Sequence, residues 1–582
     1  MTILAEGSVV RSARELIALV KKAEVGKSVL LEDLLEKIDC LAVLGDPRGV
    51  EITSVVWHHE QVTQGALYCC LPGQHFDGHD FAAKAIAKGA VALLCEHSVF
   101  PATATQSVHI YKKEDIGESI DPDVRSYVGE NQEDVSAKDQ GNSATDSIVQ
   151  VVVEKGKTRV AMAQAACTFF GNPATDLLMV GVTGTNGKTT TTFILKSIFE
   201  SAGIPTGVIG TLDGARTTPE APELQKVLSA YKEAGYKACV MEVTSHALAQ
   251  DRVYGICFDM AIFTNLSQDH LDYHGSMDEY FKAKAKLFTT NMAKVGIVNI
   301  DNAYGRRLME RSEIKVIPYG LKDVDQLDIG PNVTTFVFDN YRVRLSLGGL
   351  FNVENALAAA TAAKAYGISA KDIVAGISQA SGVPGRFEQV ESDNGVRVVV
   401  DFAHTPDALD KVLQAARSAL QDPSARLTVV FGCGGDRDKG KRPVMGQVAS
   451  VFADRIVLTS DNPRSEDPQS IIDQILAGIN SSAAVELHVE ADRQKAIEFA
   501  LRTSKPGDLV LIAGKGHEST QQIGNMTVPF DDRKVVSQFL DADADPFSEP
   551  IVWPSTAAMF AKRAQYDSID QTLLYRDSEQ TP

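Results

Sequence analysis

Apolar and polar positions alternate along this chain in three blocks, each with the pattern of strands interleaved with helices. In the first block, apolar runs at 66–71 and 91–95 flank a segment, 81–88, whose apolar residues recur at helical spacing. A second block opens with the apolar run 177–182. The third block contains the apolar runs 398–401, 428–431, 455–458 and 509–513. Strands that alternate with helices are typical of α/β domains, and 582 residues are enough for several of them.

Two stretches interrupt this pattern. Residues 112–147 are rich in Asp, Glu, Ser, Asn and Gln and have few apolar anchors, so we expect a mobile acidic insertion there. Beyond residue 541 the sequence carries three prolines and a polar end, to which the pattern assigns no role. The expected divisions of the chain are 1–110, 111–150, 151–345, 346–541 and 542–582.

Composition narrows the class of protein. A formal net charge of −19 argues against a broad surface for nucleic acid. The N-terminus has no basic segment leading into an apolar one, and no apolar run is long enough to span a bilayer. The eight cysteines show no C-x-x-C spacing, which favours reduced core residues over a zinc site. We therefore expect a cytoplasmic protein without a membrane or nucleic acid partner. We also expect it to act as a monomer.

A glycine-rich segment, Gly181-Val-Thr-Gly-Thr-Asn-Gly-Lys188-Thr-Thr, follows the run 177–182 and precedes a predicted helix. Its glycines let backbone N–H groups approach phosphate oxygens, Lys188 brings a positive charge, and the Thr189 hydroxyl suits magnesium. The strict phosphate-loop pattern requires glycine at position 182, where this chain has valine. The residues expected to bind the triphosphate are Gly184, Thr185, Asn186, Gly187, Lys188, Thr189 and Thr190.

Further candidates follow the loop. Glu242 ends the apolar strand 238–241, where a carboxylate can meet a magnesium ion held by phosphates, and His270 can add a nitrogen ligand near a second ion. At 100° per residue, Lys284 points away from the helix face that Lys282 and Lys286 share. Only one of these three lysines is therefore expected to face a site.

Six more motifs stand in order along the chain. They are Met241-Glu-Val-Thr-Ser-His246, Thr264-Asn-Leu-Ser-Gln-Asp-His270-Leu-Asp-Tyr-His274, Asp401-Phe-Ala-His404-Thr-Pro, Gly432-Cys-Gly-Gly-Asp-Arg437-Asp-Lys-Gly-Lys-Arg442-Pro, Asp461-Asn-Pro-Arg464 and Gly514-Lys-Gly-His-Glu518. With the variant loop, they resemble the Mur ligase family, in particular its branch that adds meso-diaminopimelate to UDP-MurNAc-L-Ala-D-Glu. The resemblance covers about residues 50–540 without the acidic insertion.

This resemblance implies an α/β protein of three domains: a small N-terminal uridine-binding domain, a central phosphate-loop ATPase domain with a parallel sheet, and a C-terminal Rossmann-like domain that binds the amino acid. It implies a ligase that uses ATP and Mg²⁺, forms an acyl phosphate and releases ADP and phosphate. It also implies that Lys284 carries a carbamate derived from CO₂, which would turn a cation into an oxygen ligand.

The residue roles implied by the resemblance fall into four groups. Lys188, Lys284, Glu242 and His270 are expected to be catalytic. Thr189, Glu242, His270 and Lys284 are the expected metal ligands, and ATP is also expected at Asn352, Arg386 and Asp401. The UDP-linked dipeptide is expected at Thr217, Thr218, Thr244, Gln250 and Arg252. Diaminopimelate is expected at Arg437, Asp461, Asn462, Pro463, Arg464, Gly514 and Glu518.

Within this last group, Arg464 can pair with the distal carboxylate of diaminopimelate while Glu518 takes its distal ammonium. L-Lysine lacks the distal carboxylate and would leave the guanidinium without a partner.

One segment departs from the family pattern. Where the family usually reads Asp-Ser-Arg, this chain reads His58-His59-Glu60, so the serine and arginine that help to hold the nucleotide are absent. Three alternatives stay open: a ligase for L-lysine, a folylpolyglutamate synthetase, and an inactive Mur-like scaffold. The first lacks support from Asp-Asn-Pro-Arg464, and the second would have neither the uridine domain nor that motif. The third conflicts with intact Lys188, Glu242 and Lys284.

Overall fold

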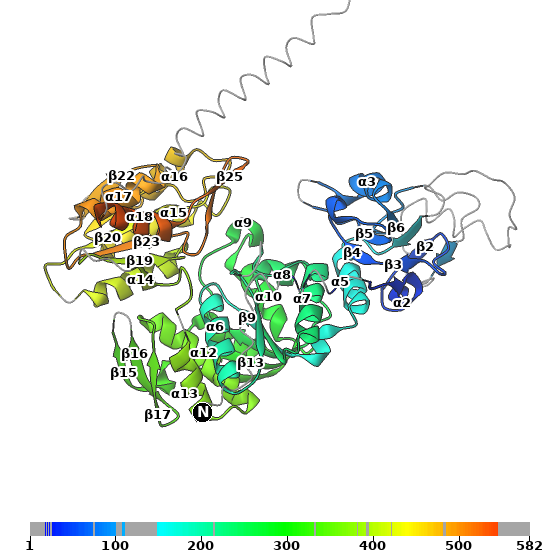
Figure 1. Cartoon of the computed structure of the whole chain (residues 1–582), viewed down its shortest axis with the longest axis horizontal. Helices are drawn as coiled ribbons and strands as arrows, with labels where there is room; N and C mark the ends of the chain where they lie inside the picture. The colour runs from blue at the N-terminus through cyan, green and yellow to red at the C-terminus, as the bar shows by residue number, and fades with distance from the viewer. Residues whose placement is uncertain are drawn as a thin grey trace, which may run out of the picture.

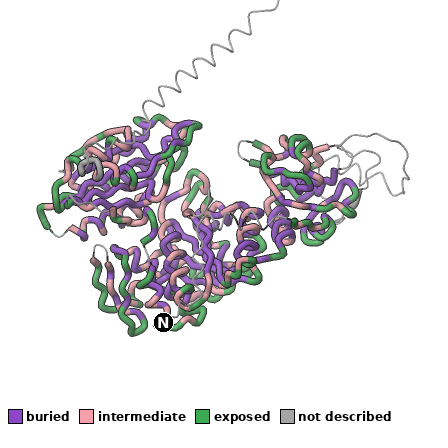
Figure 2. Tube along the Cα trace, in the orientation of Figure 1, coloured by how far each residue is buried: buried purple, intermediate pink, exposed green. Residues whose placement is uncertain are grey.

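The computed structural model describes residues 26–544 except 74–75, 101–107, 111–147, 213–215, 331–332, 381, 391–394, 421 and 481–484, together with residues 18, 20 and 23. Three α/β units follow one another along the chain, each built on a six-stranded sheet (Figure 1). Buried residues gather separately inside each unit (Figure 2). The expected acidic insertion at 112–147, and residues 545–582 of the expected tail, lie outside the described residues.

The N-terminal unit has the strand order β4-β5-β6-β8-β2-β7. Neighbours from β4 to β8 run parallel, whereas β2 is antiparallel to both β8 and β7. Its strands are β1 (Val29–Leu30), β2 (Ala42–Leu44), β3 (Glu51–Ile52), β4 (Ser54–Val56), β5 (Ala66–Cys69), β6 (Ala90–Cys95), β7 (Val108–Ile110) and β8 (Val149–Val152). Its helical elements are α2 (Leu31–Leu35), η1 (His59–Gln61), η2 (Gly78–Phe81) and α3 (Ala82–Ala87).

The central unit is a parallel sheet with the order β10-β11-β9-β12-β13-β14. Its strands are β9 (Leu178–Thr183), β10 (Thr206–Ile209), β11 (Ala238–Glu242), β12 (Phe258–Phe263), β13 (Ala293–Asn299) and β14 (Lys315–Tyr319). Its helical elements are η3 (Pro173–Asp176), α6 (Lys188–Ser201), α7 (Ala221–Glu233), α8 (Ser245–Ala249), α9 (Leu271–His274), α10 (Met277–Ala285), η4 (Lys286–Phe288), α11 (Ala303–Arg311) and η5 (Leu321–Asp323). Helix α5 (Thr158–Phe169) joins the two units, because its buried residues belong to the N-terminal core and it also contacts α7. A small antiparallel sheet follows, formed by β15 (Asp325–Ile329), β16 (Thr334–Phe338) and β17 (Tyr341–Leu345).

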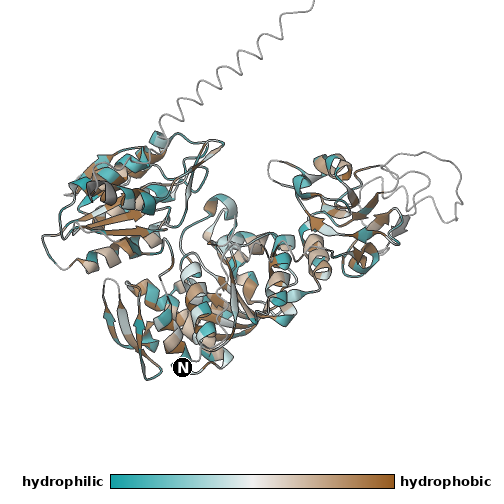
Figure 3. Ribbon diagram, viewed as in Figure 1, coloured by the Kyte–Doolittle hydropathy of each residue, from teal (hydrophilic) through white to brown (hydrophobic). Residues whose placement is uncertain are grey.

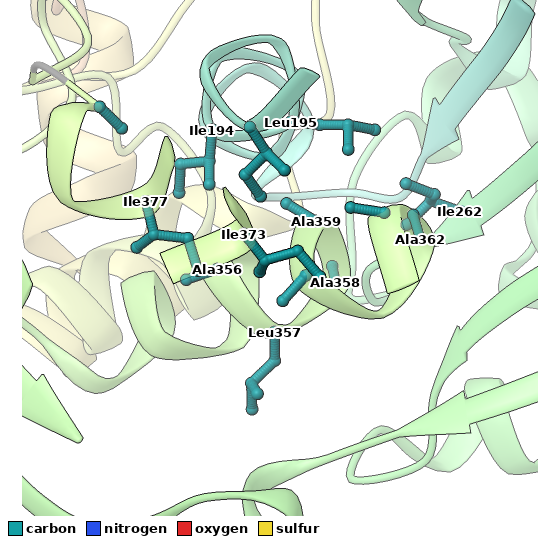
Figure 4. Packing of buried hydrophobic residues seen from close by; sticks show 14 of the residues in the cluster. Ile194, Leu195, Ile262, Ala356, Leu357, Ala358, Ala359, Ala362, Ile373 and Ile377 are labelled. Atoms are coloured by element: carbon teal, nitrogen blue, oxygen red, sulfur yellow. The ribbon is translucent and has the colours of Figure 1, made fainter. Parts of the chain in front are cut away.

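Two helices that follow the small sheet pack on the central unit. Helices α12 (Leu350–Tyr366) and α13 (Ala370–Gln379) both contact α6, and Figure 4 shows their alanines and isoleucines meeting Ile194 and Leu195 of that helix. The alanines of α12 favour helix formation and let the neighbouring helix come close. The sequence predicted that the central unit ends at residue 345. Because α12 and α13 pack on α6, we place its end near residue 380.

The C-terminal unit has the strand order β18-β19-β23-β20-β21-β22, with only β18 antiparallel to its neighbour. Its strands are β18 (Glu388–Val390), β19 (Arg397–Asp401), β20 (Leu427–Phe431), β21 (Arg455–Leu458), β22 (Glu486–Val489) and β23 (Leu509–Ala513), with a hairpin of β24 (Thr520–Ile523) and β25 (Met526–Pro529). Its helices are α14 (Pro406–Ala419), α15 (Lys441–Phe452), α16 (Pro468–Leu476), α17 (Arg493–Thr503) and α18 (Asp532–Ala544).

The hydropathy pattern predicted the main strands. The apolar runs 177–182, 398–401, 428–431, 455–458 and 509–513 coincide with β9, β19, β20, β21 and β23 to within one residue at either end. The C-terminal strands that coincide with these runs are accordingly mostly brown in Figure 3. None of the helices in the described part of the chain combines the length and apolar composition needed to cross a bilayer.

Candidate active site

The phosphate loop connects β9 to α6, and its glycines are required by its shape. Gly184 and Gly187 have φ of 153° and 86°. A Cβ atom at Gly184 would collide with the Thr264 hydroxyl, and one at Gly187 with the Asn355 side chain. The loop is held from the next strand, because the backbone N–H of Asn186 donates to Asn265 Oδ1 over 2.9 Å. Its backbone is therefore fixed before any phosphate binds.

Two lysines lie at this loop and donate to its backbone. Lys188 Nζ donates to the carbonyl oxygens of Gly184 and Thr185, each at 2.9 Å, and Lys284 Nζ donates to the same Gly184 oxygen at 2.9 Å. Neither lysine forms an ion pair within the described residues. Burial lowers the pKa of Lys188, and burial together with the charge of Lys188 holds the pKa of Lys284 well below its usual value. Two buried amines without an ion pair thus lie at the loop, where a negatively charged ligand would stabilise their protonated forms.

The prediction for the three lysines of α10 and η4 is confirmed. Lys284 is 1% exposed, whereas Lys282 is exposed and pairs with Glu279 at 2.7 Å, and Lys286 is also exposed. The helical period therefore identified the one lysine that reaches the phosphate loop.

Glu242, the last residue of β11, presents an unsatisfied carboxylate oxygen to the loop. Its Oε1 accepts hydrogen bonds from the Thr189 hydroxyl at 3.0 Å and the Thr211 N–H at 2.9 Å, while its buried Oε2 has no partner. A buried carboxylate oxygen without a partner fits a cation ligand. No three His, Cys, Asp or Glu side chains of the described chain gather closely enough to hold a metal alone. A magnesium ion here would therefore need phosphate oxygens as well.

His270 sits at the start of α9 with φ of 54°, close to a second histidine. Its Nε2 lies 3.3 Å from Asp269 Oδ2, and its ring meets the ring of His246 edge-on at 4.8 Å. Burial lowers the pKa of His270 to about 3 and that of His246 to about 4. Both imidazoles are therefore neutral at pH 7, as a metal ligand must be. His246 ends the motif Met241-Glu-Val-Thr-Ser-His246, but the sequence assigned it no role.

A pocket opens beside the loop, between the central and C-terminal units. It is lined by Asn186, Gly187, Thr190, Asn265, Phe351, Glu354, Asn355, Arg386, Asp401, Phe402, Ala403, Ala408, Lys411 and Val412. The carboxylate of Asp401 accepts hydrogen bonds from two backbone N–H groups, those of Phe387 at 2.6 Å and Ala403 at 2.7 Å. The guanidinium of Arg386 lies 4.4 Å from the centre of the Phe402 ring. Aromatic, amide and carboxylate groups of this kind suit a nucleoside.

Asn352 does not line this pocket, although the sequence placed it at the nucleotide. Its Nδ2 donates to the carbonyl oxygen of Gly348 at 2.8 Å, and its Oδ1 accepts from Asn355 Nδ2 at 3.3 Å. Asn355, one helical turn later, faces the pocket instead. Asn352 thus helps to position the Asn355 side chain through this hydrogen bond.

Several polar contacts join the C-terminal unit to the central unit around the loop. Arg386 donates to the Thr189 hydroxyl at 3.1 Å, and Asn186 donates to Asp407 Oδ2 at 2.8 Å. The two oxygens of Asp269 lie 3.5 Å from Lys441 Nζ and 3.6 Å from His404 Nε2. Burial alone would raise the pKa of Asp269, but His404 and Lys441 hold it well below its usual value. The structure therefore brings both units to the same phosphate site.

The five residues expected at the UDP-linked dipeptide form one connected group. The Thr218 hydroxyl donates to the carbonyl oxygen of Glu242 at 2.9 Å and lies 3.3 Å from the Thr244 hydroxyl. Arg252 donates to the Thr218 carbonyl at 2.9 Å and to Gln250 Oε1 at 2.6 Å. The fifth residue, Thr217, lies on the same segment, 3.1 Å from the Thr211 hydroxyl. The group adjoins the end of β11 and hence the phosphate loop.

The departing segment at His58, His59 and Glu60 is engaged in local packing. His58 caps η1, because its Nδ1 accepts from the Glu60 N–H at 3.3 Å, and the His59 ring stacks between those of His58 at 5.0 Å and Phe81 at 4.6 Å. Burial lowers the pKa of His59. The lowered pKa favours the uncharged ring of His59, which therefore does not replace the positive charge of the missing arginine.

The residues expected to bind diaminopimelate meet at the ends of β21 and β23. Arg464, with φ of 51°, donates through NH1 to the Gly435 carbonyl at 2.7 Å, and the electrostatic influence of Asp461 and Glu518 reaches its guanidinium. Burial, followed by the charge of Arg437, lowers the pKa of Arg464. Gly514 has no room for a Cβ, which would approach Asp461 Oδ2 to 2.6 Å. The carbonyl oxygen of Pro463 lies so close to Gly435 that a Cβ atom there would collide with it.

A fully buried lysine, to which the sequence assigned no role, supports this pocket. Lys515 Nζ donates to Glu518 Oε2 at 2.9 Å and to Asn462 Oδ1 at 3.2 Å, and Asn462 Nδ2 donates to the same Glu518 oxygen at 2.9 Å. Burial alone would raise the pKa of Asp461, but Lys515 and Arg493 lower it. A lysine between two glycines directly after the buried strand 509–513 was the available signal. Buried and paired, it orients the carboxylate of Glu518.

Comparisons with known proteins agree with this arrangement. The description "Mur ligase family, catalytic domain" matches residues 51–142, "Mur ligase middle domain" matches 182–363, and "Mur ligase, glutamate ligase domain" matches 385–516. A UDP-N-acetylmuramoyl-L-alanyl-D-glutamate--2,6-diaminopimelate ligase from Alkaliphilus metalliredigens is 39% identical over 526 residues, which cover 86% of this chain and 96% of that protein. The ligase of the same name from Streptomyces coelicolor is 37% identical over 529 residues, covering 87% and 96%.

Solved structures give the same result. A structure titled as a UDP-N-acetylmuramoyl-L-alanyl-D-glutamate--2,6-diaminopimelate ligase superposes with a TM-score of 0.52 at 31% identity, covering 85% of this chain and 95% of that one. MurF from Acinetobacter baumannii, at 18% identity, shares the fold with a TM-score of 0.59 and covers 88% and 99%. With three matching domains in order and relatives aligned over almost their whole length, the chain belongs to the Mur ligase family.

Proposed function

We propose that this protein is an ATP-dependent ligase that joins meso-diaminopimelate to UDP-MurNAc-L-Ala-D-Glu through an acyl phosphate. The observation that carries the proposal is that Arg464 and Glu518 lie close enough to interact electrostatically, because together they can offer a cation and an anion to the same end of an amino acid. Relatives that bear the name of this activity support it. Diaminopimelate ends in an ammonium and a carboxylate, which match this pair of charges.

In the first step, a carboxylate oxygen of the dipeptide attacks the γ-phosphorus of ATP, and the bond to ADP breaks. The transferring phosphoryl group needs positioned cations more than a covalent protein group. Lys188 belongs to the central unit and Arg386 to the C-terminal unit, and both can hold the oxygens of the transferring phosphoryl group. Thr218, Gln250 and Arg252 would hold the dipeptide beside the loop, so that its carboxylate meets the phosphate in line.

In the second step, the amine of diaminopimelate attacks the acyl carbon, and phosphate leaves. Arg464 would bind the distal carboxylate and Glu518 the distal ammonium, so the reacting amine is directed toward the phosphate loop. L-Lysine would leave Arg464 buried without its partner. A charged hydrogen bond contributes about 1.5–3 kcal/mol, so we expect discrimination of roughly ten-fold to several-hundred-fold.

Magnesium fits the oxygens present at the loop. Glu242 Oε2, the Thr189 hydroxyl and the neutral His270 are the ligands this chain offers, and a bound divalent cation would neutralise charge on the phosphates. We also propose that Lys284 becomes a carbamate. Its lowered pKa favours the neutral amine, whose lone pair attacks the carbon of CO₂ with release of a proton. Release of ¹³CO₂ on acidifying labelled protein would test this, with Lys284→Met as the control.

We propose that the protein acts as a cytoplasmic monomer. The direct test is phosphate release with ATP, Mg²⁺, UDP-MurNAc-L-Ala-D-Glu and meso-diaminopimelate, with each component omitted in turn. We expect release only from the complete mixture. Release that continues without diaminopimelate would identify an ATPase instead, and no release in any mixture would favour an inactive scaffold.

A further inference from the structure

Three arginines share one buried carboxylate at the junction of the N-terminal and central units. Glu220, 3% exposed, lies 2.7 Å from Arg159 NH1, 3.1 Å from Arg216 NH1 and 3.0 Å from Arg252 Nε. These arginines come from the first turn of α5, the segment before α7 and the segment after α8. Figure 1 shows α5 and α7 side by side next to β4. Three positive charges against one negative charge leave this cluster electropositive.

Arg216 also connects the cluster to the uridine side of the molecule. Its guanidinium lies 4.9 Å from the centre of the Trp57 ring, and the indole N–H of Trp57 donates to Glu223 Oε1 at 2.7 Å. Trp57 directly follows β4 and precedes the departing segment at His58. Even with Glu223 included, three guanidiniums face two carboxylates. The Arg216 side chain is 44% exposed and that of Arg159 27%, so both remain accessible to a ligand.

The position of the cluster matches one part of the proposed substrate. Along that substrate, the diphosphate lies between the uridine and the sugar that carries the dipeptide. Along the protein, the cluster lies between Trp57 of the N-terminal unit and the group around Thr218, which Arg252 contacts directly. The diphosphate also carries the negative charges that attract guanidinium groups.

We propose that Arg159 and Arg216, held by Glu220 beside Arg252, bind the diphosphate of the UDP-linked substrate. They thereby take the place of the arginine that the family pattern has where this chain has Glu60. Glu220 fixes the three guanidiniums before the substrate arrives, so less side-chain freedom is lost on binding. This inference rests on the proposed function for the identity of the nucleotide.

Binding can be measured without catalysis. Trp57 and Trp553 are the two tryptophans of the chain, so Trp553→Phe leaves Trp57, which contacts Arg216, as the single reporter. In this background, fluorescence titrations with uridine, UDP and UDP-MurNAc-L-Ala-D-Glu would compare Arg216→Met, Arg216→Lys and Arg159→Met/Arg216→Met. The control is Arg48→Met, because Arg48 is exposed and pairs with Asp46 in its own loop. Isothermal titration calorimetry provides a second readout that does not depend on the indole.

We expect the double variant to weaken UDP roughly ten- to hundred-fold while uridine binding stays unchanged. The UDP affinity of Arg216→Lys should lie between those of the parent protein and the double variant. Lysine keeps the positive charge but lacks the paired N–H donors of the guanidinium. Equal weakening of uridine and UDP would mean a structural role and would overturn the inference. Unchanged UDP affinity with weaker binding of the dipeptide substrate would mean that the arginines hold carboxylates, which also overturns it.

The two proposals can fail separately. UDP binding that depends on these arginines, in a chain that forms no peptide bond, would contradict the proposed function and leave the diphosphate site standing. Full ligation with unaltered UDP affinity in the double variant would do the reverse.

Discussion

The phosphate loop and the amino-acid pocket are both built around buried lysines, yet they treat charge in opposite ways. At the loop, Lys188 and Lys284 donate to carbonyl oxygens, and Lys284 also donates to the Thr183 hydroxyl at 3.4 Å; both have lowered pKa values. In the pocket, Lys515 is paired with Glu518 before any ligand arrives. The loop suits a polyanion, whose negative charge can pair with the two lysines. The amino-acid site suits a zwitterion, which needs both a cationic and an anionic partner. The charge state of a buried lysine therefore indicates the class of ligand beside it.

The largest effect is expected at the loop. Lys188→Ala should lower the rate of phosphate release about a thousand-fold, because the transferring phosphoryl group loses a positioned cation. The affinity for UDP-MurNAc-L-Ala-D-Glu, measured without ATP, should not change. A variant within ten-fold of the unmodified rate would contradict the assignment of the loop.

Removing the cation of the pocket should act on one substrate only. Arg464→Ala should lower kcat/KM for diaminopimelate about ten- to hundred-fold, through the lost guanidinium–carboxylate pair, and leave the KM for ATP unchanged. Arg426→Ala is the matched control, since Arg426 is exposed and pairs with Glu486 in the same unit. If both variants behave alike, Arg464 does not select the amino acid.

Lys515 should act through Glu518 rather than on the substrate directly. We expect Lys515→Met to raise the KM for diaminopimelate about ten-fold with little change in kcat, because the Glu518 carboxylate loses its strongest partner. In a Glu518→Gln background the same substitution should have almost no further effect. Additive losses in the double variant would show that the two residues act independently.

The smallest effect concerns the stability of the ligand-free protein. Because the pKa of Lys284 is lowered on folding, the folded state binds fewer protons than the unfolded state below pH 10.5, and stability rises with pH toward that value. Lys284→Met removes this penalty and should raise Tm by about 2–4 °C at pH 7, with a smaller gain at pH 10. Thermal unfolding in CO₂-free buffer measures it, and a gain that grows with pH would have the wrong sign.

Local features of the sequence predicted much of this architecture. The run 177–182 and its glycines located the loop, and the helical period singled out Lys284, because both signals lie within one element. The Glu220 cluster could not be predicted in this way. Arg159 and Arg252 lie 61 and 32 residues from Glu220 along the chain. The packing of α5 against α7 brings Arg159 to Glu220, and Arg252 reaches it from the segment after α8. For a similar reason the sequence pointed to Asn352, whereas Asn355 lines the pocket. The packing of α12 on α6 decides which face of α12 is turned to the pocket.

A competition between two amino acids tests the central claim most directly. Purified protein would receive ATP, Mg²⁺, UDP-MurNAc-L-Ala-D-Glu and equal concentrations of meso-diaminopimelate and L-lysine, and the products would be separated and weighed by mass spectrometry. The account predicts the diaminopimelate adduct in at least about ten-fold excess, and loss of that excess in Arg464→Ala. Equal amounts of both adducts from the unmodified protein would contradict it.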